Sequence, residues 1–248
     1  MELRRAHAGV GAGRRRHGSS SNEWRPWSRA SVFSLRSVSV AERGSWRHGP
    51  DGQVSGPDAR PERTLEVAAR VAMILDGLGV PSALIGAAAL AVHGFPRATD
   101  NVDLAVATDP FTVLREAQQR ITAALHVTAR LVTPGADDPL GGVLSITGDD
   151  FDPVQVVNFL NTLATRPNPG EEAVRTAQPG IVTGTALRVV DLPHLVALKL
   201  YAGGYKSRLD VLALLDRNPG LDCDETARIC ARFGLDEAWR DLLAEMRG

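Results

Sequence analysis

Gly86 stands between two segments that together can bind an anion. Residues 82–86 form a short apolar stretch typical of a buried strand, and the small residues of 87–92 that follow are typical of a helix. A glycine at this junction lets the backbone approach a ligand closely, and a helix N-terminus presents N–H groups without partners in the helix. The segment therefore predicts a strand, loop and helix with a phosphate-binding geometry at Gly86.

A polar group follows on the next expected strand, at residues 101–108. Side chains alternate between the two faces of a strand, so the apolar residues of this run point to a core while Asn101 and Asp103 share the opposite face. Arg97 and Thr99 come just before the strand, in a loop. These polar residues strengthen the interpretation of Gly86 as part of a binding site.

Lys199 and Lys206 are the only lysines among 28 basic side chains, and both lie in one short segment. Arginine cannot replace the compact ammonium of lysine, so their presence in an Arg-rich chain indicates a function, with chance survival as the alternative. Leu195 and Val196 lie one helical turn before Lys199, which places it at the edge of a buried face. An ammonium there needs a partner, and two roles remain open: contact with a phosphate, or an ion pair with Asp210.

The elements that must position these residues alternate between strand and helix. Ordered structure is expected to begin with an amphipathic helix from Leu65 that ends at Gly77 and Gly79, and Asp109 is expected to cap a helix that runs to Leu125. The other expected strands are 127–132, 142–147, 154–160 and, after an irregular Pro/Gly-rich stretch, 183–190; the other expected helices begin near Leu192, Ser207, Asp224 and Asp236. This order predicts a small mixed sheet followed by a helical C-terminal part.

Two motifs resemble those of the DNA polymerase β-type nucleotidyltransferase superfamily. The first, at 85–106, is similar to the family pattern of an apolar residue, a Gly-Gly or Gly-Ser pair, a small-residue helix, Arg-x-Thr and Asp-x-Asp on a strand; the second, at 191–215, is similar to its later helical motif. The chain resembles in particular the bacterial branch of toxin nucleotidyltransferases from abortive-infection and toxin–antitoxin systems. The resemblance covers about residues 65–216 and implies an α+β fold of the polymerase β type, with flanking helices.

The resemblance also implies a metal site. In the family three carboxylates hold two divalent ions, Mg²⁺ or Mn²⁺, and the corresponding positions here are read as Asn101, Asp103 and Asn158, so that two of the three are amides. An amide oxygen can bind Mg²⁺ but brings no charge, so binding of one Mg–NTP ion is expected to survive better than transfer chemistry. In a different register Asp152 would be the third ligand; the alternative for the acids at 149–152 is a solvated turn.

Individual roles follow from the same resemblance. It implies catalytic roles for Asp103, Lys199 and Asp210, nucleotide-binding roles for Gly86, Ala87, Arg97, Thr99 and Lys199, and metal-binding roles for Asp103, Asn101 and Asn158. For Arg97 and Thr99 the alternative is simple bracing of the loop. The histidines lack metal-ligand spacing and are expected to pack or to cap helices; they are His93, His126 and His194.

The function implied is transfer of a nucleoside monophosphate from an NTP to an acceptor hydroxyl, on an RNA 3′ end or on a protein side chain. The expected partners are a nucleoside triphosphate and either an RNA acceptor or a cognate antitoxin protein. The alternative function is that of a catalytically impaired, nucleotide-binding pseudoenzyme or a partner-binding module.

Charge divides the chain into unlike parts. Residues 1–60 hold eleven arginines against five acidic residues and show no sustained apolar period, which predicts a disordered tail. The whole chain has a formal charge of −1, so residues 61–248 carry about −7, which gives no independent support to RNA binding. The expected organisation is a tail at 1–60, a nucleotidyltransferase-like core at 61–191, and a helical region at 192–248 packed on the core.

No apolar run approaches the roughly 18 residues of a membrane span, and the N-terminus lacks the apolar core of a signal peptide. The chain is therefore expected to be cytoplasmic and to have no membrane partner. Cys223 and Cys230 are about 10 Å apart along an expected helix, beyond the reach of a disulfide, and are expected to be free, half-buried thiols.

Overall fold

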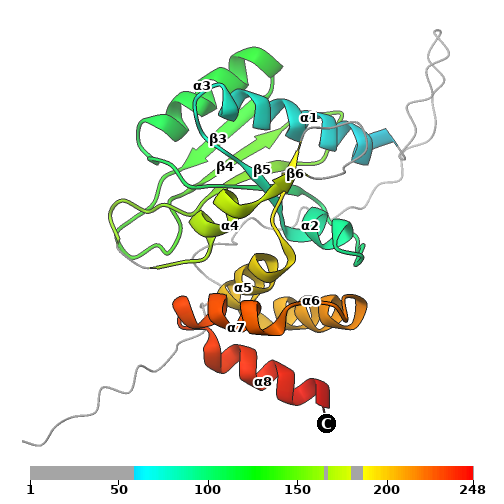
Figure 1. Ribbon diagram of the computed structural model, residues 1–248. Helices are drawn as coiled ribbons and strands as arrows, with labels where there is room; N and C mark the ends of the chain where they lie inside the picture. The colour runs from blue at the N-terminus through cyan, green and yellow to red at the C-terminus, as the bar shows by residue number, and fades with distance from the viewer. Residues whose placement is uncertain (1–58, 165–166, 180–186, 248) are drawn as a thin grey trace, which may run out of the picture. The chain divides into compact units, whose positions relative to one another are not determined.

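The computed structural model describes residues 59–164, 167–179 and 187–247 (Figure 1). The elements follow one another as α1 (Ala59–Asp76), β1 (Ala83–Ile85), α2 (Gly86–Val92), β2 (Val102–Val106), α3 (Val113–Leu125), β3 (Thr128–Val132), β4 (Val143–Thr147), β5 (Val154–Asn158), α4 (Gly170–Thr176), β6 (Gln178–Pro179), β7 (Arg188–Val189), α5 (Leu192–Ala202), α6 (Gly204–Arg217), α7 (Cys223–Arg232) and α8 (Asp236–Arg247).

The strands form one mixed sheet in the order β3-β4-β5-β2-β1-β7-β6. β2 lies inside the sheet, antiparallel to β1 and parallel to β5. β3, β4 and β5 form an antiparallel meander, which short turns can connect, whereas a parallel pair requires a longer crossover. The predicted α+β fold with a mixed sheet is confirmed.

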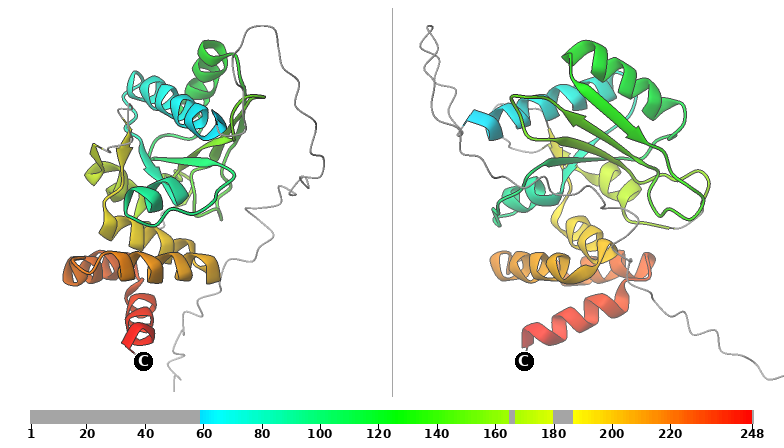
Figure 2. Two further views of the ribbon diagram at one scale, coloured as in Figure 1. Left: turned by 90° about the vertical axis from the view of Figure 1, so that its right-hand side faces the viewer. Right: turned by 180° about the vertical axis from the view of Figure 1, so that it is seen from behind.

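α1 and α3 cover one face of the sheet (Figure 1, Figure 2). The fully buried Leu104, Leu144 and Ile146 point to this face, because strand pairing places them on the same side as the β3 residues packed under α3. Burial of such side chains stabilises the fold by roughly 1.5–3 kcal/mol each. The alternation predicted for residues 101–108 is therefore correct, and it leaves Asp103 on the opposite face.

α2 and α4 pack against β2 from that opposite face, where Ala105 is fully buried. The β3 end of the face is more open. Thr128, Arg130 and Val132 alternate as exposed residues along β3, and on β4 Ser145 is half-buried. The sheet thus has one covered face and a second face that is covered only in part.

The C-terminal helices pack on one another. α5 contacts α4, α6 and α7, and α8 contacts both α6 and α7 (Figure 1). Two of these helices begin with an aspartate cap: Asp191 accepts a hydrogen bond from the His194 backbone N–H at 2.9 Å, and Asp222 accepts one from the Glu225 backbone N–H at 2.8 Å. Each cap satisfies a backbone donor that the first helical turn leaves free.

Several boundaries differ from the sequence predictions. α1 begins at Ala59, before the expected start at Leu65. α4 and β6 occupy the Pro/Gly-rich stretch that was expected to be irregular: Pro169 lies at the N-cap of α4, and a Cβ on Gly170 would lie 1.9 Å from the Phe159 ring. Gly170 lets the start of α4 pack closely against Phe159. The proline and glycine of this stretch therefore mark the beginning of a helix and not an irregular segment. Residues 1–58 of the expected tail lie outside the described residues. So do residues 183–186 of the expected strand 183–190, whereas β7 lies in its second half.

Among the described residues, no helix combines the length and apolar character needed to cross a bilayer. Cys223 and Cys230 are free thiols, as predicted, but neither is half-buried: Cys223 is exposed and Cys230 is buried. Burial, together with the charge of Asp236, raises the pKa of the Cys230 thiol to about 12. Cys230 is therefore an unreactive packing residue at neutral pH.

Candidate functional site

Gly86 and Asp103 meet where β1 ends. In the antiparallel β1–β2 pair Ile85 lies opposite Asp103, and Gly86 follows with φ +63°. A Cβ on Gly86 would lie 2.3 Å from Oδ2 of Asp103, so this position needs glycine both for its backbone conformation and for the close approach of the carboxylate. The group nearest to the Cβ position of Gly86 is thus the carboxylate of Asp103.

A chain of hydrogen bonds joins the preceding loop to this carboxylate. The Thr99 hydroxyl donates to the backbone oxygen of Asn101 at 3.0 Å and contacts its Oδ1 at 3.2 Å, and Nδ2 of Asn101 donates to Oδ1 of Asp103 at 2.6 Å. Thr99 and Asn101 therefore brace the loop and hold Asp103. The shared face predicted for Asn101 and Asp103 is confirmed.

Asp103 titrates well above the ordinary range of an aspartate. Burial raises the pKa of its carboxyl, and the nearby charges of Lys199 and Arg97, with the hydrogen bond from Asn101, lower it; the net result is a rise from 3.8 to about 6. At neutral pH the carboxylate is ionised and lies within the field of two cations. A metal ion bound to a phosphate could therefore bind here, with the ion at the carboxylate and the phosphate near the two cations.

Lys199, Asp210 and Arg97 form a compact ion cluster next to Asp103. Nζ of Lys199 on α5 lies 2.7 Å from Oδ2 of Asp210 on α6, and Nε of Arg97 lies 3.1 Å from Oδ1 of the same carboxylate. The Asp210 side chain is 5% exposed and the Lys199 side chain 12%. The ion pair weighed as an alternative for Lys199 is therefore present, and a phosphate contact stays a prediction.

The loop that carries Arg97 is fixed to the end of α6. The guanidinium of Arg217 lies 5.0 Å from the centre of the Phe95 ring, and Nδ2 of Asn218 donates to the backbone oxygen of His93 at 3.0 Å. Nε2 of His93 in turn lies 2.8 Å from the backbone oxygen of Val190. These contacts hold Arg97 within reach of Asp210, and His93 has the packing role expected for it.

The sequence placed Asn158 beside Asp103, and this placement is wrong. In the parallel β2–β5 pair the residue opposite Asp103 is Gln155, whereas Asn158 lies opposite Val106. Asn158 is fully buried, and its amide donates to the backbone oxygens of Thr108 and Gly141 at 2.9 and 3.0 Å. The Asn158 side chain therefore bonds to backbone groups at the ends of β2 and β5, and the residue paired with Asp103 is Gln155.

The acidic turn before β5 is bound to α1. Nε of Arg63 lies 3.1 Å from Oδ2 of Asp150, and the Asp152 backbone N–H donates to the Thr64 hydroxyl at 2.9 Å. The register that would make Asp152 a neighbour of Asp103 is not the one observed, since β5 begins beyond it at Val154. A structural turn accounts for these acids.

The donor set around Asp103 suits one hard cation. Within the described part of the chain no group of three His, Cys, Asp or Glu side chains could hold a metal ion. Mg²⁺ is commonly held by one or two carboxylates together with substrate phosphates, so Asp103 with an amide oxygen from Asn101 or Gln155 fits an ion that arrives on a triphosphate. Asn101 must then turn its Nδ2 away from Asp103, because a cation takes the place of that hydrogen bond.

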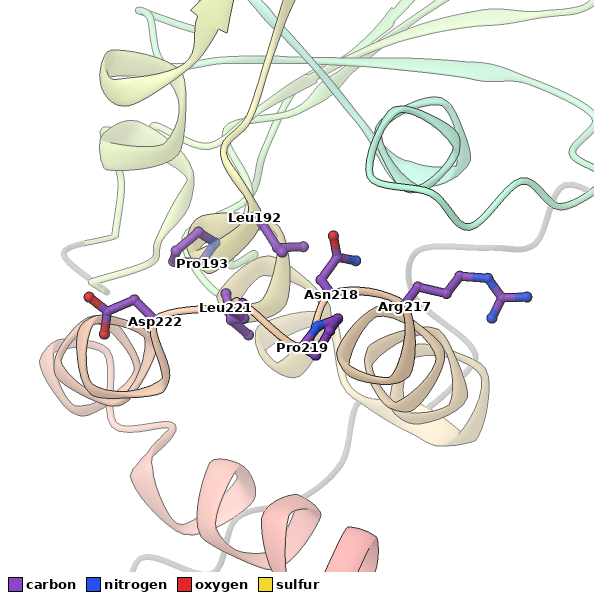
Figure 3. A pocket seen from close by; sticks show the side chains of 8 residues that line it. Leu192, Pro193, Arg217, Asn218, Pro219, Leu221 and Asp222 are labelled. Carbon is purple, nitrogen blue, oxygen red and sulfur yellow. The ribbon is translucent and has the colours of Figure 1, made fainter.

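Two surface hollows lie away from the predicted site residues. One, of about 480 Å³, is lined by Leu192, Pro193 and residues 217–222 (Figure 3), and another, of about 720 Å³, lies along residues 159–175 and the end of α7. None of the predicted site residues lines either hollow. Lys206 is exposed on α6, and Ala87 is buried beside the site.

Replacement of Gly86 by Ala is expected to lower the free energy of unfolding by about 2–3 kcal/mol, because the new Cβ meets Asp103 in addition to adopting a positive φ. Gly94→Ala is the matched control: its φ is +85°, but a Cβ there meets nothing within 4 Å. Urea unfolding of both variants should show Gly86→Ala as the more destabilised by at least about 1 kcal/mol. Equal losses would show that the approach of Asp103 is not constraining.

No protein-family model and no curated protein matches the chain in sequence. Among solved structures, similarity is found to an antigenic nucleotidyltransferase-like protein from Paracoccidioides brasiliensis, at 16% identity and a TM-score of 0.46 over 76% of this chain and 94% of that one. The solution structure of the antibiotic-resistance factor ANT(2″)-Ia is similar at 13% identity and a TM-score of 0.44, over 74% and 96%. A crystal structure of ANT(2″)-Ia in complex with adenylyl-2″-tobramycin is similar at 18% and 0.36, over 74% and 98%. Likenesses this distant assign neither a family nor an activity to the chain.

Proposed function

We propose that this chain binds a magnesium–nucleoside triphosphate at Asp103 and transfers the nucleoside monophosphate to an acceptor hydroxyl. The observation that carries the proposal is the convergence of Gly86, Asp103 and the two cations Lys199 and Arg97 from four separate segments. An ionised carboxylate next to cations offers Mg²⁺ and phosphate complementary charges. The motif resemblance to polymerase β-type nucleotidyltransferases supports the same reaction.

Each residue then has a role in binding. Asp103, with oxygen from Asn101 or Gln155, would hold the ion, and the ion would neutralise charge on the phosphates. Lys199 and Arg97 would contact phosphate oxygens, which requires each to share or leave Asp210. Gly86 would let the triphosphate lie close to β1, because no side chain stands there.

The reaction is a substitution at the α-phosphorus. The acceptor oxygen forms a bond to phosphorus, the bond to the oxygen that bridges to the β-phosphate breaks, and pyrophosphate leaves with that electron pair while the hydroxyl proton passes to water. The contribution of the protein is to hold the reactants in line and to stabilise the charge on the phosphates. Lys199 and Arg97, whose charges act on Asp103, would stabilise that charge.

A second candidate function is nucleotide binding without transfer. It is favoured by the amides at two of the three positions around Asp103, since Asn101 and Gln155 supply no charge for a second ion. In this case the chain is a nucleotide-dependent partner-binding protein. A cognate antitoxin, membership of the toxin branch and a cytoplasmic location remain predictions from the sequence.

One comparison separates the two functions. The double substitution Asn101→Asp/Gln155→Asp raises the carboxylate count beside Asp103 from one to three and is expected to increase NMP transfer at least about 100-fold, because a second ion can bind. Full-length wild type and variant are incubated with α-labelled NTPs, Mg²⁺ or Mn²⁺, and total RNA and protein. Label in both supports a transferase, and label in the variant alone supports binding without transfer.

Asn158→Asp is the matched control for that experiment. Compared with the single substitution Gln155→Asp, it adds the same charge on the same strand, but at a buried amide that donates to backbone oxygens. It is expected to destabilise the fold without creating activity, because a carboxylate cannot donate those hydrogen bonds. Activity gained through Asn158→Asp and not through Gln155→Asp would refute the placement of the site.

A further inference from the structure

The partly open face of the sheet carries a continuous polar row that ends at Asp103. Strand pairing places Arg130 opposite Ser145, Ser145 opposite Gln155, and Gln155 opposite Asp103. Directly paired residues share a face, so the four side chains cross β3, β4, β5 and β2 on the side away from α1 and α3. Arg130 is exposed, and the other three are half-buried.

Arg130 is free to bind a ligand. It forms no ion pair or hydrogen bond with any residue that the structure describes, unlike Arg63, Arg97 and Arg120, which pair with acids. An unpaired guanidinium on a strand presents a planar fork that suits a carboxylate or a phosphate. On the strand segments of this face, Arg130 and Asp103 are the only formal charges, one at each end of the row.

An apolar row runs beside the polar one. Val132, Val143 and Val157 are paired across β3, β4 and β5 in the same way, and Val132 is 54% exposed. The face therefore combines a polar track with a neighbouring apolar track. A ligand that lies along it needs apolar groups as well as one anion.

We infer that this face binds the acceptor, and that the acceptor is a polypeptide segment with a hydroxyl side chain and an acidic residue about four positions away. The inference rests on the proposed transferase function. Three strand spacings separate Arg130 from Asp103, about 14 Å, and four residues of extended chain span about 13 Å. The acid would pair with Arg130 while the hydroxyl lies at Asp103.

The other acceptor classes fit the face less well. RNA needs several cations and aromatic rings for stacking, whereas the described strand segments here carry one arginine and no aromatic side chain. A polycationic acceptor needs several acids, and Asp103 alone is present on these segments. A polypeptide with a single acid matches both the charge and the valine row.

The test uses two Ala/Val-rich peptides, each with one Ser, and with either Glu or Gln four residues away. Both are titrated into the ¹⁵N-labelled full chain, and amide shifts are followed by NMR. The Glu peptide is expected to shift amides of β3, β4 and β5 and to bind about 5- to 10-fold more tightly than the Gln peptide, since it adds one charge-assisted pair. Arg130→Glu and Arg130→Gln are expected to abolish that preference.

Arg115→Glu is the control, because Arg115 is exposed on α3, on the covered side of the sheet, and its reversal changes the net charge equally. It should leave the preference intact. Equal binding of both peptides, absence of shifts on β3 to β5 at millimolar peptide, or stronger shifts of the same amides by a single-stranded RNA 12-mer would each overturn the inference. Calorimetric titration of Mg–NTP into the same proteins tests the nucleotide site separately, so failure of one is distinguishable from failure of the other.

Discussion

Asp210→Ala is expected to lower the free energy of unfolding by about 3–5 kcal/mol. The Asp210 side chain is 5% exposed and is the partner of both Lys199, at 2.7 Å, and Arg97, at 3.1 Å. Its removal leaves two partly buried cations without their carboxylate. The cost comes from those uncompensated charges, so it exceeds the net contribution of the ion pairs themselves.

The measurement is urea unfolding of the full chain, followed by circular dichroism. Asp216→Ala is the control, because Asp216 lies on the same helix, is 80% exposed and stands 4.0 Å from Arg217; a change within about 0.5 kcal/mol is expected there. Adding Lys199→Met to Asp210→Ala should recover part of the loss, because it removes one stranded charge. A loss of less than 1 kcal/mol for Asp210→Ala would contradict the structural role of the cluster.

Asp103→Asn is expected to weaken Mg–NTP binding at least about 100-fold, the equivalent of about 2.7 kcal/mol. Asp103 is the only carboxylate in the proposed donor set, so its replacement removes all the negative protein charge that would neutralise the ion. Isothermal titration calorimetry at pH 7.5 measures the change. Asp100→Asn is the matched control, since Asp100 is an exposed carboxylate three residues away, and its affinity should stay within about twofold of wild type.

The same site should respond to pH. Because the pKa of Asp103 is about 6, wild-type affinity is expected to fall by about tenfold between pH 7 and pH 5, beyond the titration of the nucleotide itself. Asp100→Asn should follow the wild type, and Asp103→Asn should show only the titration of the nucleotide. Parallel profiles for all three proteins would show that Asp103 does not bind the ion.

Stability should change with pH in the opposite sense. The folded protein holds the Asp103 proton more tightly than the unfolded chain, so this group contributes stability below about pH 4, and that contribution is lost as the pH rises through 6. Asp103→Asn is therefore expected to be more stable than wild type above pH 6 by about 1–2 kcal/mol, with the difference vanishing near pH 4. Thermal unfolding at both pH values measures it.

Local sequence patterns predicted the chemistry on single elements. The apolar alternation of 101–108 placed Asn101 and Asp103 on one face of a strand, and the glycine before a small-residue helix located the β1–α2 junction. Helix starts at Leu192 and Asp236 were also correct. These features depend on residues close together in the chain, so a short window of sequence contains the information.

Long-range pairing decided which residues meet. Gln155 and Asn158 both lie on β5. Only the register of β5 against β2 places Gln155 opposite Asp103 and leaves the buried Asn158 side chain to bond to backbone oxygens. A shift of one residue would reverse the faces, and no periodicity within β5 fixes its alignment with another strand. α4 was missed for a related reason, because its glycine packs against Phe159 from a different segment.

The sequence by itself thus determined the elements around Gly86 and Asp103 and the types of group they present. Tertiary structure decided between the two roles left open for Lys199, by pairing it with Asp210 beside Arg97. It also placed Gln155 opposite Asp103 and Arg130 at the far end of the same row. The physical reason is that side-chain type and local periodicity are properties of neighbouring residues. Charge compensation and strand register, in contrast, depend on segments that only folding brings together.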